Sequence, residues 1–150
     1  LAAEGVPFRV ALAGENFRMA PAEFAEARDR LGGRLVHYGF AEQRADYARL
    51  LWSADVVLST AIHEFFGVSV VEAIYCGAQP VLPNALSYPE LLPPASHAAC
   101  LYTGFEDLLA HLRVALARPA AGPLLREHVR RFDWAVQASL YDALMEEVTE

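Results

Sequence analysis

Two glutamates, Glu64 and Glu72, stand eight positions apart with a glycine, Gly67, between them. The apolar run 56–58 precedes them, and an apolar segment of helical character carries the second glutamate. If the run is a strand, the polar turn after it lies at the carboxyl end, which is where open α/β sheets bind ligands. The helix that follows offers free backbone N–H groups to an anion. The stretch 58–89 therefore predicts a site for a phosphorylated, hydroxyl-rich ligand.

Each residue type in this turn suits such a ligand. A carboxylate at the turn can accept hydrogen bonds from sugar hydroxyls, and one on the helix can take the two vicinal hydroxyls of a ribose. Gly67 lacks a Cβ and lets the backbone come close to a ligand. The N–H groups of Val68, Ser69 and Val70 would point at a diphosphate, aided by the helix dipole. Ser69 is equally well explained as an ordinary residue of a helix N-terminus.

Several common catalytic patterns lack their defining residues. The chain has no G-x-G-x-x-G after its first expected strand, no G-x-x-x-x-G-K-[ST] and no G-x-S-x-G, so ordinary dinucleotide, P-loop and hydrolase sites are not expected. The five histidines form no close ligand pairs with one another or with cysteine, which argues against a zinc site. No Asp-x-Asp pair offers a platform for a metal-bound diphosphate. The sequence predicts neither a metal nor a cofactor.

Composition restricts the class of protein. With 150 residues, 55% of them hydrophobic and 21% charged, the chain is expected to form one globular domain with a sizeable core. A net charge of −7 argues against a surface that grips nucleic acid by itself, because such binding depends on neutralising phosphates. The small basic group of Arg126, His128, Arg130 and Arg131 is interpreted as a solvated helix face rather than an anion site.

The cysteines and the ends of the chain bear on its setting. Cys76 and Cys100 stand among apolar neighbours, which predicts buried free thiols and fits a reducing cytoplasm. No apolar run reaches 18 residues, so a membrane span is not expected. Because the chain begins at Leu1 rather than Met, we expect a segment of a longer protein.

Strand-like and helix-like segments alternate along the chain. Strands are expected at residues 8–13, 34–38, 55–59, 79–83 and 98–102, and helices at 20–31, 43–53, 68–76 and 105–117. A loop containing Tyr88-Pro89-Glu90 is expected after the fourth strand. This alternation predicts βαβ crossovers and a doubly wound, Rossmann-like parallel sheet, an α/β fold.

Two more helices are expected at the end, at residues 124–131 and 133–147. The second has an apolar stripe of Val136, Leu140, Leu144 and Val148. This stripe must pack either on an edge of this domain or on a partner domain.

The region around the two glutamates resembles the donor-binding motif of family 4 retaining glycosyltransferases of the GT-B fold, whose typical form is E-x-F-G-x-x-x-x-E-A. Here the motif is Glu64, Phe66, Gly67, Glu72 and Ala73. The run 54–59 resembles the family strand A-D-V-x-x-x-S, Gly77 with Pro80-Val81 resembles its G-x-P-V segment, and Phe132-Asp133-Trp134 resembles its F-S-W. The resemblance covers nearly the whole chain. It implies the C-terminal, nucleotide-sugar-binding half of a two-domain enzyme over residues 1–150.

The resemblance also implies roles for single residues. Glu64 would be the candidate catalytic residue, in contact with donor-sugar hydroxyls, and Glu72 would hold the ribose. The other donor-binding candidates are Phe66, Gly67, Val68, Ser69, Val70 and, at the nucleobase, Gly39 and Phe40. His63 is either a polar contact to the sugar or, as we favour, a residue that fixes the turn.

Within the family, HEFFG with the downstream Tyr88-Pro89-Glu90 is most similar to members of the tRNA-queuosine mannosyltransferase type, which implies GDP-mannose as donor and leaves tRNA open as acceptor. The missing N-terminal domain would bind the acceptor. The family's basic pair for the diphosphate has no convincing match, and Arg9 and Arg18 are the nearest candidates. We expect the isolated fragment to bind nucleotide weakly and to transfer nothing.

Two other classes stay open. The chain could be a non-enzymatic α/β module for interaction or regulation, in which the two glutamates are simply solvated. A sugar-nucleotide epimerase or a phosphorylase on the same two-domain scaffold is the third hypothesis.

Overall fold

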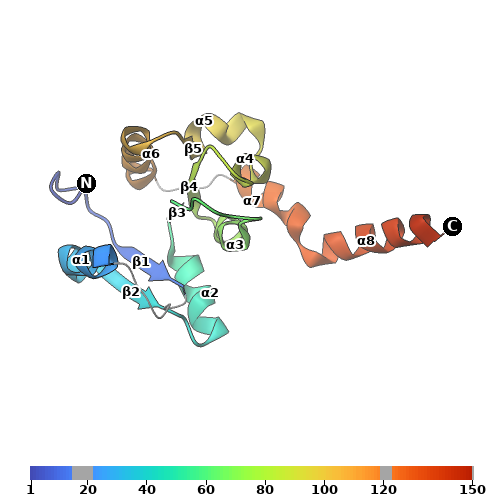
Figure 1. Cartoon of the computed structure of the whole chain (residues 1–150), viewed down its shortest axis with the longest axis horizontal. Helices are drawn as coiled ribbons and strands as arrows, with labels where there is room; N and C mark the ends of the chain where they lie inside the picture. The colour runs from blue at the N-terminus through green and yellow to red at the C-terminus, as the bar shows by residue number, and fades with distance from the viewer. Residues whose placement is uncertain (15–21, 119–122, 150) are drawn as a thin grey trace. The chain divides into compact units, whose positions relative to one another are not determined.

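The computed structural model describes residues 1–14, 22–118 and 123–149. By the density of its contacts the chain divides into two compact units, Leu1–Ser53 and Ala54–Glu150 (Figure 1). Each unit is a set of parallel strands with helices between them. The expectation of a single domain that forms part of a larger two-domain protein stays a prediction.

The first unit is built on two parallel strands. Its elements are β1 (Val10–Ala13), α1 (Ala22–Leu31), a 3₁₀ turn η1 (Gly32–Arg34), β2 (Leu35–Gly39) and α2 (Arg44–Ser53). Leu12 lies opposite Tyr38 and Ala13 opposite Gly39 in the register of the pair. Beyond the last pair, the N–H of Gly14 donates to the carbonyl of Gly39 at 3.1 Å, so the ladder continues to the carboxyl ends of both strands.

The second unit contains three parallel strands in the order β3, β4, β5. The strands are β3 (Val56–Leu58), β4 (Gln79–Pro83) and β5 (Leu101–Tyr102). The helices between and after them are α3 (Val68–Cys76), α4 (Tyr88–Leu91), η2 (Pro94–Ser96), α5 (His97–Cys100), α6 (Phe105–Ala117), α7 (Pro123–Val129), η3 (Arg130–Phe132) and α8 (Trp134–Thr149). The loops that follow the three strands therefore leave from one edge of the sheet.

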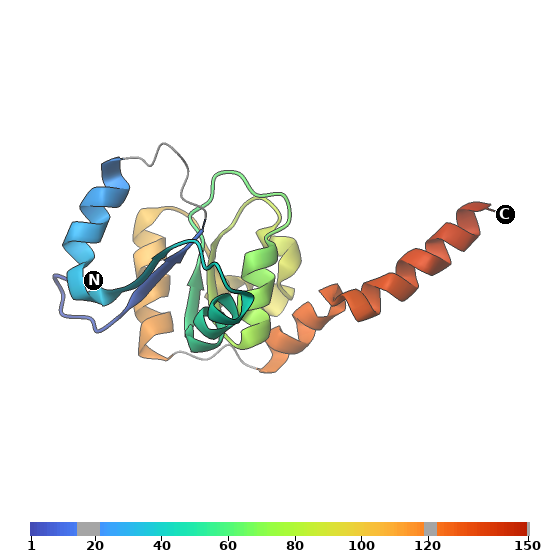
Figure 2. The ribbon, with the colours of Figure 1, turned by 90° about the horizontal axis from the view of Figure 1, so that it is seen from below.

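Both faces of these three strands are covered. Successive residues of a strand point to opposite faces, and the two cores follow this alternation. On one face Val57, Leu82 and Leu101 join a cluster with α3 and α7; on the other, Val56, Val81 and Tyr102 join a cluster with α6. Figures 1 and 2 show α3 and α6 on opposite sides of the strands. Coverage on both faces explains why the strands are short, continuous apolar runs.

The predicted α/β class, with parallel strands that alternate with helices and a chain that ends in helices, is confirmed. Two local predictions are wrong. Residues 98–100 belong to α5, so that the strand expected at 98–102 is only Leu101–Tyr102. Tyr88-Pro89-Glu90 lies in the short helix α4 and not in a loop, because Tyr88 is drawn into the core and is only 1% exposed. Arg18 lies outside the described residues, as do residues 20 and 21 of the helix expected at 20–31.

The last helix, α8, exposes most of its apolar side chains. Val136 is 46% exposed, Leu140 53% and Leu144 56%, and the side chain of Val148 lies outside what the structure describes. Asp133 begins the helix, because its carboxylate accepts the N–H of Ala135 at 3.0 Å. The predicted apolar stripe is thus present, and in this chain it is left open to solvent.

Candidate donor site

The turn over residues 59–67 joins the carboxyl end of β3 to the first residue of α3. Ser59 continues the strand ladder, since its N–H donates to the carbonyl of Val81 at 3.2 Å. At the other end Gly67 caps α3 with φ 94° and ψ 42°, a left-handed conformation that glycine adopts readily. The turn therefore lies where the sequence predicted it, at the carboxyl edge of the sheet.

The carboxylate of Glu64 shapes this turn. Its Oε1 accepts the N–H of Phe65 at 3.0 Å and that of Phe66 at 3.3 Å. An ionised carboxylate has two oxygens and about four acceptor positions, so Oε2 keeps acceptor capacity for a ligand. Glu64 can thus order the turn and bind hydroxyl groups at the same time.

The start of α3 can hold an anion through its first amides. The N–H groups of Val70 and Val71 both donate to the carbonyl of Gly67 at 3.0 Å. The helix geometry leaves the amides of Val68 and Ser69 without an intrahelical acceptor. Three amides were predicted to bind the diphosphate. The amide of Val70 already donates to Gly67, so Val68 and Ser69 are the two whose amides suit that role. The side chain of Val70 is buried in the core at 4% exposure.

Glu72 lies on the exposed side of α3, one turn before Cys76. Burial raises the pKa of the Cys76 thiol, and the negative charge of Glu72 adds to this rise while Arg126 opposes it. With Glu64 before Gly67 and Glu72 in α3 after it, the two glutamates lie on either side of the helix start, as in the donor-binding motif.

Gly67 has a structural reason to be glycine besides its backbone conformation. A Cβ at this position would stand 3.1 Å from Cδ1 of Leu91 and 3.3 Å from Cε1 of Tyr88. Such contacts are closer than ordinary packing allows. The missing side chain thus lets α4 pack directly on the start of α3, and this packing was not foreseen from the sequence.

Phe66 packs against Phe132, a residue 66 positions further along the chain. Its ring meets Phe132 edge to face, with centroids 5.1 Å apart and an interplanar angle of 87°. The guanidinium of Arg131 lies over the ring of Phe132, 4.6 Å from its centroid. The Nη2 of Arg131 donates to the carbonyl of Glu90 at 2.6 Å. Phe132 had entered only as part of a family pattern, and its contact with Phe66 gives it a physical role.

His63, Gly39 and Phe40 complete the predicted set. The side chain of His63 is exposed, and its role stays a prediction. Gly39 ends β2 with φ 108°, and its carbonyl accepts Nε2–H of His37 at 3.0 Å. Phe40 follows with a ring 59% exposed, which suits stacking against a base. Gly39 and Phe40 belong to the first unit and the glutamates to the second.

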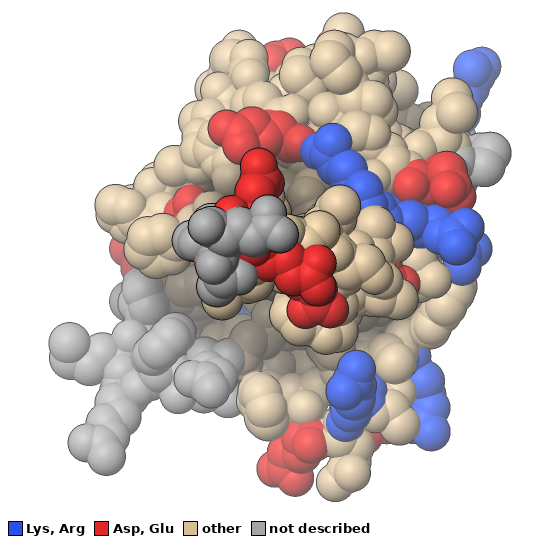
Figure 3. Space-filling view, turned by 90° about the vertical axis from the view of Figure 1, so that its right-hand side faces the viewer, with Lys and Arg blue, Asp and Glu red and all other residues tan. Residues whose placement is uncertain are grey.

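The arginines of the basic group near the end of the chain each have a partner within the described residues. Arg126 lies over the ring of Tyr75, Arg130 pairs with Glu127, and Arg131 is engaged as described. His128 departs from the predicted solvated face: burial and the nearby Arg131 lower its pKa. Figure 3 shows acidic and basic side chains mixed on the face it displays. Arg9 precedes β1 and so lies at the amino end of that strand, away from Gly39.

Comparison with known proteins decides the family. The glycosyl transferases group 1 family matches residues 3–131. The chain belongs to this family. The predicted glycosyltransferase family, the fold and the general class of function are thereby confirmed. This match identifies the family domain and does not show that the fragment is active.

Two relatives of this group 1 domain are mannosyltransferases by name. One is the tRNA-queuosine alpha-mannosyltransferase of Drosophila melanogaster, 46% identical over 88 residues, which are 59% of this chain and 23% of the relative. Another is a GDP-mannose-dependent alpha-(1-6)-phosphatidylinositol dimannoside mannosyltransferase of Mycobacterium tuberculosis, 32% identical over 115 residues, 77% of this chain and 29% of the relative. The matched part of the chain thus spans about a quarter of the length of either relative.

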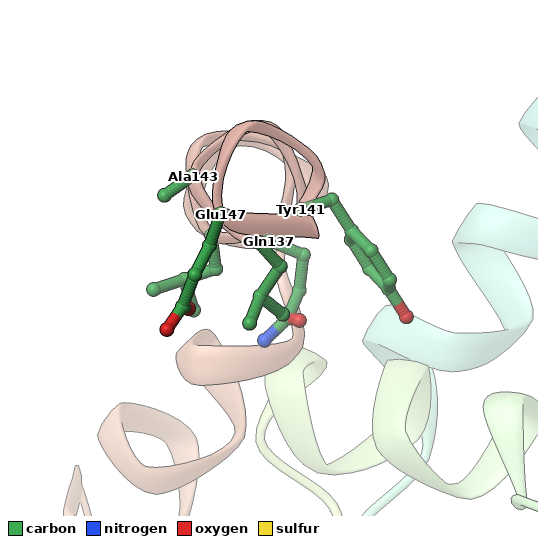
Figure 4. Close-up of a pocket in the computed structure, with 6 residues that line it drawn as sticks. Gln137, Tyr141, Ala143 and Glu147 are labelled. Carbon is green, nitrogen blue, oxygen red and sulfur yellow. The ribbon is translucent and has the colours of Figure 1, made fainter. Parts of the chain in front are cut away.

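Within residues 1–14, 22–118 and 123–149, no helix is long and apolar enough to cross a membrane, and no group of three or more His, Cys, Asp or Glu could hold a metal ion. A shallow hollow runs along α8, between side chains that include Gln137, Tyr141 and Glu147 (Figure 4). None of the predicted donor-site residues lines it.

Proposed function

We propose that this group 1 domain is the C-terminal, donor-binding half of a two-domain retaining glycosyltransferase that transfers mannose from GDP-mannose to an acceptor hydroxyl. The observation that carries the proposal is the turn before α3, where the carboxylate of Glu64 accepts two backbone N–H groups and Gly67 caps the start of the helix. Both named relatives support mannose as the sugar, and the name of the second supports GDP-mannose as the donor.

In this proposal each group has one task. Glu72 binds the ribose, the amides of Val68 and Ser69 bind the diphosphate, and Glu64 binds sugar hydroxyls through Oε2. The partial positive charge of the helix start faces the charge that grows on the leaving diphosphate, and this preorganised electrostatic stabilisation lowers the barrier. Holding donor and acceptor together supplies the rest of the rate enhancement. No metal is required by these steps.

The N-terminal half of the enzyme would bind the acceptor. We propose a tRNA nucleoside as that acceptor, on the strength of the name of the relative that is 46% identical. The acidic net charge of −7 in this half does not conflict with an RNA acceptor, because the other half would carry the RNA contacts. A cytoplasmic location fits both this acceptor and two free cysteines.

Calorimetry on the full-length enzyme tests the donor site. We expect GDP to bind more tightly than UDP, and Glu72→Ala to weaken GDP by about tenfold or more, because hydrogen bonds to a charged group contribute roughly 1.5–3 kcal/mol. Glu26→Ala is the matched control, since it removes an exposed carboxylate of α1 that pairs with Arg30 at the surface. Equal binding by wild type and Glu72→Ala, or no binding at all, would refute the proposal.

A transfer assay tests the acceptor. Labelled GDP-mannose is incubated with the full-length enzyme and either unfractionated tRNA or phosphatidylinositol mannoside. Label in tRNA alone supports the proposed acceptor, and label in lipid alone replaces it with the second relative's type of acceptor. With inorganic phosphate added in place of an acceptor, formation of mannose 1-phosphate and GDP would instead indicate a phosphorylase, and an isomerised sugar nucleotide would indicate an epimerase.

A further inference from the structure

The donor turn over residues 59–67 rests on two adjacent residues, Ser87 and Tyr88, at the start of α4. Tyr88 is 1% exposed and belongs to the core cluster that includes Val70 and Ile74 of α3. Ser87 is half-buried and precedes the helix. Their contacts reach both ends of the turn, which no local sequence pattern would bring together.

At the start of the turn, Tyr88 holds Ser59. Its Oη and the Oγ of Ser59 share a hydrogen bond of 2.7 Å, and the same Oγ accepts the N–H of Ala61 at 3.2 Å. The Oη of Tyr102 donates to the carbonyl of Ser59 at 2.9 Å. Burial raises the pKa of Tyr102, with a smaller contribution from Tyr88, so this hydroxyl keeps the proton it donates. The first residue of the turn is therefore fixed through both its side chain and its backbone.

At the end of the turn, Ser87 holds Phe66. Its Oγ donates to the carbonyl of Phe66 at 3.0 Å. The ring of Tyr88 fills the space next to Gly67 that a side chain would need. One dipeptide thus contacts Ser59, five residues before Glu64, and Phe66, two residues after it.

The backbone before this dipeptide is strained. Leu86 has φ 59°, the left-handed region that residues with a Cβ rarely adopt. Such a conformation persists only where the surrounding contacts determine it. Ser87 and Tyr88 follow directly, and their contacts with the donor turn are among those that hold this backbone.

We propose that Ser87 and Tyr88 are positioning residues that hold Glu64 in place for the donor sugar. The inference rests on the proposed function, in which Glu64 contacts the sugar. It separates two parts of the donor site. Glu64 lies between the two anchored residues, whereas Glu72 and the amides of Val68 and Ser69 belong to α3, which is held by its own buried side chains. Loosening the anchors should therefore disturb sugar binding and leave nucleotide binding nearly intact.

Affinities of the full-length enzyme for GDP and GDP-mannose test this separation. For Tyr88→Phe and Ser87→Ala we expect GDP-mannose to bind about five- to tenfold more weakly, the size of one lost hydrogen bond, with GDP unchanged within about twofold. Ser87→Thr, which keeps a hydroxyl, should restore the affinity lost in Ser87→Ala. The controls are Tyr141→Phe on the exposed helix α8 and Ser53→Ala, whose Oγ donates to the carbonyl of Leu50 at 2.9 Å in the first unit.

Hydrogen exchange of the turn, measured without ligand, is the second readout. We expect amides of residues 60–66 to exchange about five- to tenfold faster in both variants, because their opening becomes easier, and at the wild-type rate in both controls. Sugar-nucleotide binding equal to wild type, or an equal loss for GDP and GDP-mannose, would overturn the positioning role. If the wild type binds no nucleotide, faster exchange in the variants supports the anchors and overturns only the proposed function, and unchanged exchange overturns both.

Discussion

Two regions of the second unit, the donor turn and the helix α8, expose large apolar side chains. They differ in the contacts that hold their backbone. In the donor turn Ile62 is 82% and Phe65 101% exposed, while the backbone beneath is held by Ser59, Glu64 and Ser87. On α8, Trp134 is 72% and Met145 66% exposed. The contacts of α8 with the rest of the unit lie mainly at η3.

An exposed apolar residue therefore has a different meaning in each region. In the turn the side chains are exposed while the backbone that carries them is fixed by hydrogen bonds and core packing, as a binding site requires. On α8 a regular apolar face is exposed without such support, which is typical of a surface that another element covers. Substitutions in both regions test this contrast.

Tyr88→Ala should be the most damaging change. It removes a ring that is 1% exposed and leaves a cavity under the turn, which we expect to lower the free energy of unfolding by about 3–5 kcal/mol. Tyr141→Ala on α8, where the ring is 56% exposed, should cost about 1 kcal/mol or less. Urea unfolding followed by fluorescence and circular dichroism measures both. Similar losses in the two variants would remove the contrast between the regions.

Gly67→Ala should come next, with Gly77→Ala as its matched control. Both glycines have positive φ, 94° and 108°, and alanine in that region costs about 1–2 kcal/mol. A Cβ at Gly77 meets nothing within 4 Å, whereas one at Gly67 meets Tyr88 and Leu91. We therefore expect Gly67→Ala to be less stable than Gly77→Ala by a further 1–3 kcal/mol, roughly the penalty for overpacking. Equal losses in chemical denaturation would show that α4 yields to the new methyl group.

His128 tests the junction between the two regions, since α7 packs on α3 and leads through η3 to α8. Its pKa is lowered from 6.5 in the folded state by burial and by Arg131. As the pH falls from 6.5 toward the lower pKa of the folded state, the unfolded chain binds a proton at His128 that the folded protein does not, so acidification through this range destabilises the fold.

The measurement is the melting temperature between pH 7 and pH 5. We expect it to fall less in His128→Gln than in wild type, whereas His63→Gln, at an exposed position, should follow wild type. Parallel pH profiles for all three proteins would show that His128 does not contribute to acid lability.

Leu144→Ala should have the smallest effect. Its side chain is 56% exposed, so we expect a change in unfolding free energy of about 0.5 kcal/mol or less in this chain. Leu91→Ala, at 1% exposure, should cost about 2–5 kcal/mol in the same chain. The two are compared by thermal unfolding. A large loss for Leu144→Ala would mean that α8 packs on its own unit after all.

Local pattern was sufficient for much of the fold. The helices α3 and α6 and the strand β4 begin and end at the predicted residues, because periodicity and flanking glycines or prolines mark them clearly. The segment from α4 to β5 was misassigned. A four-residue helix such as His97–Cys100 is too short to show a period, and Nε2 of His97 bonds to the carbonyls of Pro89 and Leu92, which the chain brings near only when folded.

The candidate site divides in the same way. Residue type and spacing along one turn are local properties, so the sequence alone predicts that a helix starts after a strand between Glu64 and Glu72. The contacts that hold the turn, Tyr88 against Ser59 and Phe132 against Phe66, form only when distant segments pack together. Those partners lie 29 and 66 positions apart in the chain. Packing between distant segments depends on the shape of the whole core, and no short pattern encodes it.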